Sequence, residues 1–185
     1  MKATGIVRRI DELGRVVIPK EIRRTLRIRE GDPLEIYTDR DGEIILKKYS
    51  PISELEDFAK EYADSLHQAV GHICMISDKD TFIAVSGANK KDYLDKMISP
   101  ELENIIESRK PVVPNIAAGH DPLKLVVGDK EAVQYKAMTI VPIISSGDAI
   151  GSVVLVSKDN NTQMGDVELK VAEAAAGFVG RQIEQ

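Results

Sequence analysis

The chain has 185 residues, an apolar fraction of 43% and a charged fraction of 30%, values typical of a soluble globular protein with one large or two small domains. Its formal net charge of −5, taken alone, argues against a nucleic-acid partner. The single cysteine, Cys74, excludes an internal disulfide framework and a cysteine-based zinc site, and no apolar run is long enough to span a membrane.

The net charge conceals an asymmetry between the two ends of the chain. Residues 1–50 hold 12 Lys and Arg against 9 Asp and Glu, and within residues 1–30 the ratio is 9 to 4. The remaining residues hold 13 basic and 21 acidic side chains. This division indicates a basic binding end joined to an acidic body. Because the first residues contain no apolar secretory core, we expect a cytoplasmic protein.

The first fifty residues predict short strands, two turns and one helix. We expect two strands, Thr4–Ile10 and Arg15–Ile18, on either side of the turn Asp11–Gly14. A helix is expected over Lys20–Arg27, followed by a hairpin of the strands Leu34–Thr38 and Glu43–Lys48 around the turn Asp39–Gly42. A segment this small buries little apolar surface, and it holds no cysteine or cluster of metal ligands to compensate. We therefore expect an obligate, intertwined dimer.

The helix predicted over Lys20–Arg27 has a cationic face opposite an apolar one. At about 100° per residue, four cations fall within roughly a 100° arc: Lys20, Arg23, Arg24 and Arg27. Arg8, Arg9 and Arg15 lie on the strands predicted before the helix. The planar guanidinium suits phosphate oxygens and guanine edges, and dimerisation would double the patch. The pattern favours nucleic-acid binding over the alternative, a solvated charged surface.

A second helix is predicted over Ser53–Val70. Ser53 is placed to cap it, and Glu56 completes a capping-box pattern. Apolar residues recur with alternating spacings of four and three at Leu55, Ala59, Tyr62, Leu66 and Ala69. This seam is only two heptads long, which is too short to decide what it packs against. It could pack against a partner helix in another chain or on the second domain of the same chain.

The pattern from His72 onward is α+β. Strands are expected over His72–Ser77, Thr81–Ser86, Leu123–Val127, Ala137–Ile144 and Ala149–Ser157, and helices over Pro100–Arg109 and Met164–Ile183. This order predicts an antiparallel sheet flanked by helices. One stripe of the last helix carries Val167, Val171, Ala174 and Phe178.

Chemical motifs are weak in this second half. Cys74 lies in a predicted strand between apolar residues, which favours a buried structural thiol. His67, His72 and His120 show no metal-ligand spacing, and neither a nucleophile with its base nor a Gly-rich phosphate loop is evident. We expect no catalytic residue, no metal site and no enzymatic activity.

Residues 1–26 carry a close family resemblance. The stretch over residues 14–26 reads GRVVIPKEIRRTL, and with the thirteen residues before it, it resembles the AbrB-type transition-state regulators, DNA-binding proteins of spore-forming bacteria. The resemblance covers residues 1–50. It implies a mostly-β swapped-hairpin fold, in which two chains form an interleaved dimeric β-barrel with a short helix.

The length and the acidic second half resemble those members of the family that carry a C-terminal GAF domain, an α+β antiparallel sheet flanked by helices. Family arginines that contact DNA match Arg8, Arg15, Arg23 and Arg24, and Arg9 and Lys20 are further candidates for phosphate contact. The family reads the shape and flexibility of double-stranded DNA with tolerance of base sequence. The resemblance thus implies an activator or repressor of sporulation genes.

The MazE-type antitoxins share the hairpin fold and add a toxin-binding tail. They supply the alternative function, a module for protein interaction.

We expect three segments: residues 1–50 for DNA binding, residues 51–71 as a linker and dimerisation helix, and residues 72–185 as a GAF-like domain for sensing and oligomerisation. The terminal helices of the GAF-like domain are expected to join dimers into a homotetramer. No cofactor is known for this pattern, and an unidentified small-molecule ligand of the GAF-like domain is left open. The resemblance places the protein at the bacterial nucleoid, in the developing spore, with no membrane partner.

Overall fold

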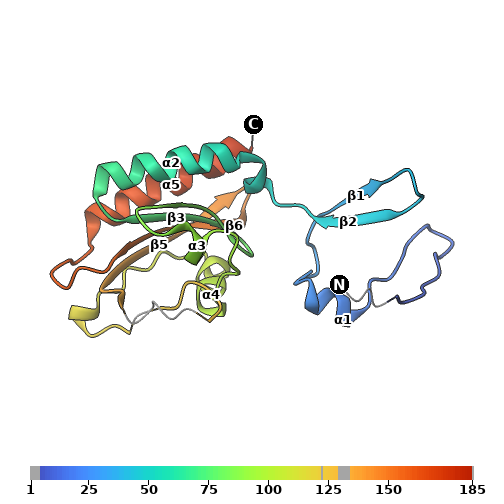
Figure 1. Ribbon diagram of the computed structural model, residues 1–185, viewed down its shortest axis with the longest axis horizontal. Helices are drawn as coiled ribbons and strands as arrows, with labels where there is room; N and C mark the ends of the chain where they lie inside the picture. Colours follow the sequence, from blue (N-terminus) through green and yellow to red (C-terminus); the bar gives the residue numbers. More distant parts are fainter. Residues whose placement is uncertain (1–4, 122, 129–133, 185) are drawn as a thin grey trace. The chain divides into compact units, whose positions relative to one another are not determined.

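The computed structural model describes residues 5–121, 123–128 and 134–184. The chain forms two compact units, Met1–Tyr49 and Ser50–Gln185 (Figure 1). We refer to them as the first and the second unit and describe each by itself.

The first unit contains one short helix and one hairpin. Helix α1 spans Lys20–Thr25, and strands β1 (Leu34–Thr38) and β2 (Ile44–Lys48) pair antiparallel with each other. Asp39 shapes the turn between the strands, because its Oδ1 accepts hydrogen bonds from the N–H groups of Asp41 (3.0 Å) and Glu43 (2.9 Å). The hairpin is therefore confirmed almost to the residue.

The two strands predicted before the helix are wrong for the single chain. Of the segments Thr4–Ile10 and Arg15–Ile18, Thr4 lies outside the described residues, and the remaining residues belong to no strand. A strand exists only where a neighbour accepts and donates its ladder hydrogen bonds, and β1 and β2 pair only with each other. The turn between the two segments forms as expected, with Gly14 at a φ of +78°.

The first unit has no hydrophobic core of its own. Among residues 5–49, Pro19 is the one buried residue. The large apolar side chains that lie exposed come from every part of the unit: Ile6, Val7, Ile10, Leu13, Val16, Val17, Leu26, Ile36, Tyr37, Ile44, Ile45 and Leu46. A unit with this surface cannot be stable alone in water.

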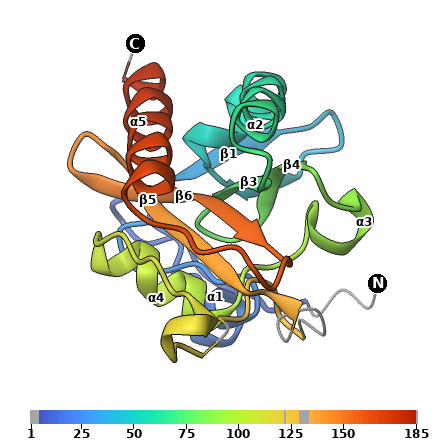
Figure 2. The same cartoon turned by 90° about the vertical axis from the view of Figure 1, so that its left-hand side faces the viewer.

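The second unit is built on a four-stranded antiparallel sheet. The strand order is β4-β3-β6-β5, and the strands span Phe82–Ser86, Ile73–Asp78, Asp148–Ser157 and Ala137–Ser145. Helices α2 (Glu56–Val70) and α5 (Asp166–Ile183) lie side by side on one face, and α4 (Pro100–Ser108) lies on the other, as Figure 2 shows. The predicted antiparallel sheet with flanking helices is confirmed.

Shorter helices complete the second unit. The 3-10 turn η1 spans Pro51–Leu55, helix α3 spans Lys90–Tyr93, and the 3-10 turn η2 spans Ile116–Ala118. Each is only a few residues long and lacks the repeated apolar spacing that would predict a helix.

Each face of the sheet has its own apolar core. The cluster under α2 and α5 includes Ala59, Ala63, Leu66, Ala172, Ala175, Ala176 and Val179, which pack on residues of the strands. The cluster on the opposite face includes Phe82, Tyr93, Leu102, Ile106, Leu125, Tyr135 and Met138. Helix α2 therefore packs on the second unit, the simpler of the two alternatives for its apolar seam.

Several predicted boundaries need correction. Ser53 lies inside η1, and the residue before α2 is Leu55, so the α-helix begins at Glu56 without the expected capping box. Helix α5 begins at Asp166 rather than Met164. The strand predicted over Leu123–Val127 does not form, because this apolar run makes only an isolated bridge between Val126 and Ile98.

Helix α5 approaches β5 closely at Gly180. A Cβ atom at this position would overlap the carbonyl oxygen of Ile144. Gly177, one turn earlier on the same helix, has no such neighbour. The close approach means that α5 presents small residues to the sheet, while the stripe with Val167, Ala174 and Phe178 remains exposed.

Candidate nucleic-acid interface

In the turn Asp11–Arg15, the carboxylate of Asp11 holds the side chain of Arg15 by a hydrogen bond. Oδ1 of Asp11 accepts hydrogen bonds from the N–H groups of Leu13 (2.9 Å) and Arg15 (2.8 Å), and Oδ2 accepts one from Nε of Arg15 (2.7 Å). The backbone and side-chain hydrogen bonds from Arg15 hold the pKa of Asp11 below its ordinary value. The contact engages one of the five N–H donors of the guanidinium, and the Arg15 side chain is 70% exposed.

Helix α1 carries three of the predicted cations. Lys20, Arg23 and Arg24 are all exposed, and Arg23 and Arg24 lie in the last turn, where positive charge is favoured by the helix dipole. The acidic residue of this helix, Glu21, lies in its first turn. The helix is thus a compact cationic element.

Arg27 does not belong to this helical face. The helix ends at Thr25, and Arg27 adopts a φ of +52° and is partly buried. Its carbonyl oxygen accepts a hydrogen bond from Nζ of Lys48 at 3.0 Å. The predicted arc of four cations therefore reduces to three.

Arg8 and Arg9 lie on the extended segment before the turn, and both are exposed. All six predicted contact residues are therefore at the surface of the first unit.

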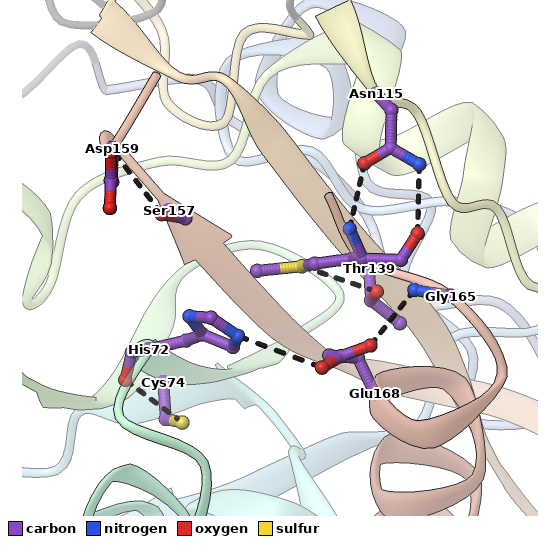
Figure 3. Close-up of polar contacts among 9 residues, drawn as sticks. His72, Cys74, Asn115, Thr139, Ser157, Asp159, Gly165 and Glu168 are labelled. Carbon is purple, nitrogen blue, oxygen red and sulfur yellow. Dashed lines mark hydrogen bonds and ion pairs between the residues drawn. The ribbon is translucent and has the colours of Figure 1, made fainter. Parts of the chain in front are cut away.

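The polar contacts of the second unit hold its own loops together. The side-chain amide of Asn115 forms two hydrogen bonds with the backbone of Met164 (Figure 3). Its oxygen accepts from the Met164 N–H at 2.9 Å, and its Nδ2 donates to the Met164 carbonyl at 2.8 Å. Nearby, Nε2 of His72 lies 3.8 Å from Oε1 of Glu168. The Gly165 N–H donates to Glu168 and holds the pKa of that carboxyl below its ordinary value.

Cys74, Tyr93 and Tyr135 are buried side chains of the second unit. Cys74 is buried, and burial raises the pKa of its thiol to about 12, so it stays protonated. The hydroxyls of Tyr93 and Tyr135 share a hydrogen bond (2.9 Å) inside the second core. Within the described ranges, no three His, Cys, Asp or Glu side chains are grouped to hold a metal ion.

An aromatic cluster lies between the two long helices. Phe58 and Tyr62 of α2 stack at 5.6 Å between ring centroids, and Phe178 of α5 lies 5.7 Å and 5.5 Å from them. Phe178 stays 38% exposed, and burial raises the pKa of Tyr62. Sequence reasoning placed Tyr62 and Phe178 on apolar stripes and missed that they meet, although Phe58 and Tyr62 are spaced by four.

In the described part of the chain, no helix combines the length and apolar character needed to cross a membrane.

Comparison with protein families divides the chain in the same region as the structure does. Residues 54–184 match the family described as stage V sporulation protein T C-terminal, transcription factor. Residues 7–54 match the family described as antidote-toxin recognition MazE, bacterial antitoxin. The MazE match ends at residue 54, and the folded second unit beyond it matches the transcription-factor family instead. The alternative of an antitoxin with a toxin-binding tail is therefore the weaker one.

One relative matches the whole chain, and another matches only part of it. The chain is 61% identical to stage V sporulation protein T of Bacillus subtilis over 185 residues, the full length of both chains. It is 55% identical to transition state regulatory protein AbrB of Bacillus subtilis over 75 residues, 40% of this chain and 77% of that one.

The fold of the second unit is that of a GAF domain. The structure resembles the GAF domain of an Acinetobacter phosphoenolpyruvate-protein phosphotransferase with a TM-score of 0.57 and 15% identity, over 75% of this chain and 84% of that one. Identity this low shows a common fold alone.

Proposed function

This chain belongs to the stage V sporulation protein T family of transcription factors, and we propose that it regulates sporulation genes by binding double-stranded DNA through the first units of two chains. The contact residues in this proposal are Arg8, Arg9, Arg15, Lys20, Arg23 and Arg24 of each chain. It reads the shape and flexibility of the duplex more than its base sequence, and it activates or represses according to the promoter.

The exposed apolar surface of the first unit carries this proposal. Its side chains face water along the segment before α1 and on both hairpin strands, with Val7 95% and Ile36 70% exposed. A second chain that interleaves its own hairpins would bury these residues and pair the two extended segments as strands. The dimer then has a core that the single chain lacks, and it brings two sets of cations together.

The cations suit phosphate and groove contacts. Arginine binds phosphate oxygens through its planar guanidinium group. Asp11 accepts a hydrogen bond from Nε of Arg15 and so orients the guanidinium of that residue. A short helix with exposed arginines beside extended arms contacts several phosphates without burying a long recognition helix in one groove.

Binding of labelled promoter DNA, followed by fluorescence anisotropy, tests the proposal. Arg15→Ala and Arg24→Ala should each lower the affinity at least tenfold, about 1.4 kcal/mol, with the dimer intact in sedimentation. Lys60→Ala removes an exposed cation of the second unit and should leave the affinity unchanged. Binding of both arginine variants at the wild-type level would show that the contact face is assigned wrongly.

We propose that the second unit joins dimers into a tetramer through its terminal helices. Phe178 extends the aromatic cluster to the surface, and Val167 on the same helix is 69% exposed. These residues form an apolar stripe on the outer side of α5, which association would cover. Phe178→Glu should halve the mass in sedimentation, whereas Val127→Glu, a change at a 57% exposed site outside the helices, should not. An unchanged mass for Phe178→Glu contradicts a tetramer built on this stripe.

The remaining assignments follow from the family. We propose no enzymatic activity, a cytoplasmic protein at the nucleoid of the developing spore, and an organisation into residues 1–50, 51–71 and 72–185 for DNA binding, linkage and sensing. A small-molecule ligand of the GAF-like domain has no identified site. Screening of compounds for stabilisation of the full chain would reveal one.

A further inference from the structure

The connection between the two units has no free residue. The N–H of Tyr49 donates to the carbonyl of Pro33 at 3.0 Å, within the first unit. The next residue, Ser50, donates from Oγ to Oδ2 of Asp78 at 3.0 Å, within the second unit. A flexible linker of n residues spreads over roughly 5–6 Å × √n, and here n is zero.

The acceptor of the Ser50 hydrogen bond is held firmly. Asp78 ends strand β3 and is 8% exposed. Its Oδ1 accepts from the N–H groups of Asp80 and Thr81, both at 2.7 Å, and its own N–H donates to the carbonyl of Thr81 at 2.9 Å. A carboxylate fixed in this way by the β3–β4 turn gives Ser50 a defined anchoring point on the sheet.

Two residues further on, Ile52 is inserted into the core under α2 and α5. It is fully buried. A Cβ atom on Gly151 of β6 would lie 2.8 Å from its Cδ1 and would overlap the carbonyl oxygen of Ser77. Glycine at position 151 thus leaves the space that Ile52 fills, and η1 packs on β6, α2 and α5.

We infer that Ser50 and Ile52 are positioning residues for DNA binding: they fix the start of the second unit to its sheet, so that motion between the units is confined to the single connection Tyr49–Ser50. The inference rests on the proposed DNA-binding function. Neither residue contacts DNA. Both limit how far a first unit can move away from the oligomer that carries it.

This restriction matters because the tetramer proposed above would carry more than one DNA-binding module, so the inference also rests on that assembly. When one module is bound, the next binds as an intramolecular event whose effective concentration falls as the connection lengthens. A connection with no flexible residue keeps the effective concentration of the second module high on a duplex that is long enough for both modules. On a short duplex that accepts one module, the joint has no effect.

A six-residue Gly/Ser insertion between Tyr49 and Ser50 of the full chain tests the inference. The probes are two A·T-rich duplexes, one of about 15 and one of about 60 base pairs, roughly one and a half and six helical turns. The insertion should lower the affinity for the long duplex roughly three- to tenfold and leave the affinity for the short duplex unchanged. The same insertion after Asn160, in the exposed loop before α5, is the matched control and should change neither affinity.

Cleavage by chymotrypsin after Tyr49 reports the anchor itself. Ser50→Ala removes one hydrogen bond and should speed cleavage there about two- to tenfold, and Ile52→Ala should do the same. Ser65→Ala, whose Oγ donates to a carbonyl of its own helix, should not. Because Ile52→Ala removes core packing, Ser50→Ala decides the outcome if the other variant unfolds.

The two proposals fail in different ways. Equal affinity of the insertion and control variants for the long duplex, with short-duplex binding intact, overturns the positioning role and leaves DNA binding standing. An unchanged cleavage rate for Ser50→Ala also overturns it. Failure of the unmodified chain to bind either duplex overturns the proposed function.

Discussion

The salt dependence of DNA binding gives the sharpest test of the cationic face, with Arg23→Ala as the perturbation. Arg23 is exposed on α1, and its backbone N–H donates to the carbonyl of Pro19 at 2.9 Å. Alanine keeps that hydrogen bond and is the best helix former. The substitution therefore removes a charge and leaves the helix in place.

The expected magnitude follows from counterion release. The substitution removes two phosphate contacts per dimer, so the slope of log affinity against log salt becomes shallower by about 1.8. Between about 50 and 200 mM salt, the wild type should then lose roughly tenfold more affinity than the variant.

The assay is fluorescence anisotropy of one labelled duplex at four or more salt concentrations. Arg40→Ala is the matched control, because Arg40 is an exposed cation in the turn between β1 and β2 and its loss changes the net charge equally. The control slope should stay at the wild-type value. If Arg40→Ala and Arg23→Ala flatten the slope to the same degree, the effect is one of net charge, and the assignment of a contact face is refuted.

Three further predictions concern the fold. Gly180→Ala should destabilise the chain by about 1–3 kcal/mol, because a Cβ there overlaps the backbone of β5; thermal unfolding measures it. Asn115→Ala should cost about 1–3 kcal/mol in denaturant unfolding, since two backbone groups lose their partners. Hydrogen bonds from the turn hold the pKa of Asp11 below its ordinary value, so the turn should be fully ordered above about pH 4 and lose its order as the pH falls through the depressed pKa, which an NMR titration of the carboxyl measures.

Each of these predictions has a control or a contradicting result. Gly177→Ala, at an open position on the same helix, should be neutral or stabilising, and a loss equal to that of Gly180→Ala argues against the close approach. Asn160→Ala, at an exposed position, should change stability by less than about 0.5 kcal/mol. A titration midpoint of Asp11 at or above its ordinary value would mean that the turn is open in solution.

Apolar runs between turn residues were enough to predict the sheet of the second unit. Strands β4, β5 and β6 each differ from their predicted ranges by one residue at one end, and β3 is shifted by one residue at both ends. The run Leu123–Val127 has the same composition, and Leu125 and Val126 are buried as a strand would bury them, but no ladder forms. Composition predicts burial, whereas pairing depends on which neighbour lies alongside.

The first unit shows a second limit of sequence reasoning. The predicted strands before α1 are extended and unpaired in one chain, because a pattern that can pair needs a partner that this chain does not supply. The end of α1 was placed two residues late for a different reason. Arg27 is held by Lys48 of β2, and Asp32 accepts from the N–H of Arg29 at 2.8 Å. The contact between Lys48 and Arg27 joins residues far apart in the sequence, so the residues around the helix end give no local signal of it.

The part of the chain proposed to bind DNA is also the part that cannot fold alone, and this couples the two units. In the proposed dimer the cationic face is complete only when two first units have interleaved. The fraction of chains that carry a complete face would then depend on how often two first units meet. The second unit has its own core on both faces of the sheet. The proposed association through this unit would hold first units together at a high effective concentration. In the proposed assembly the acidic unit would raise DNA affinity without approaching the phosphates, and a ligand that changed its association would also change DNA binding.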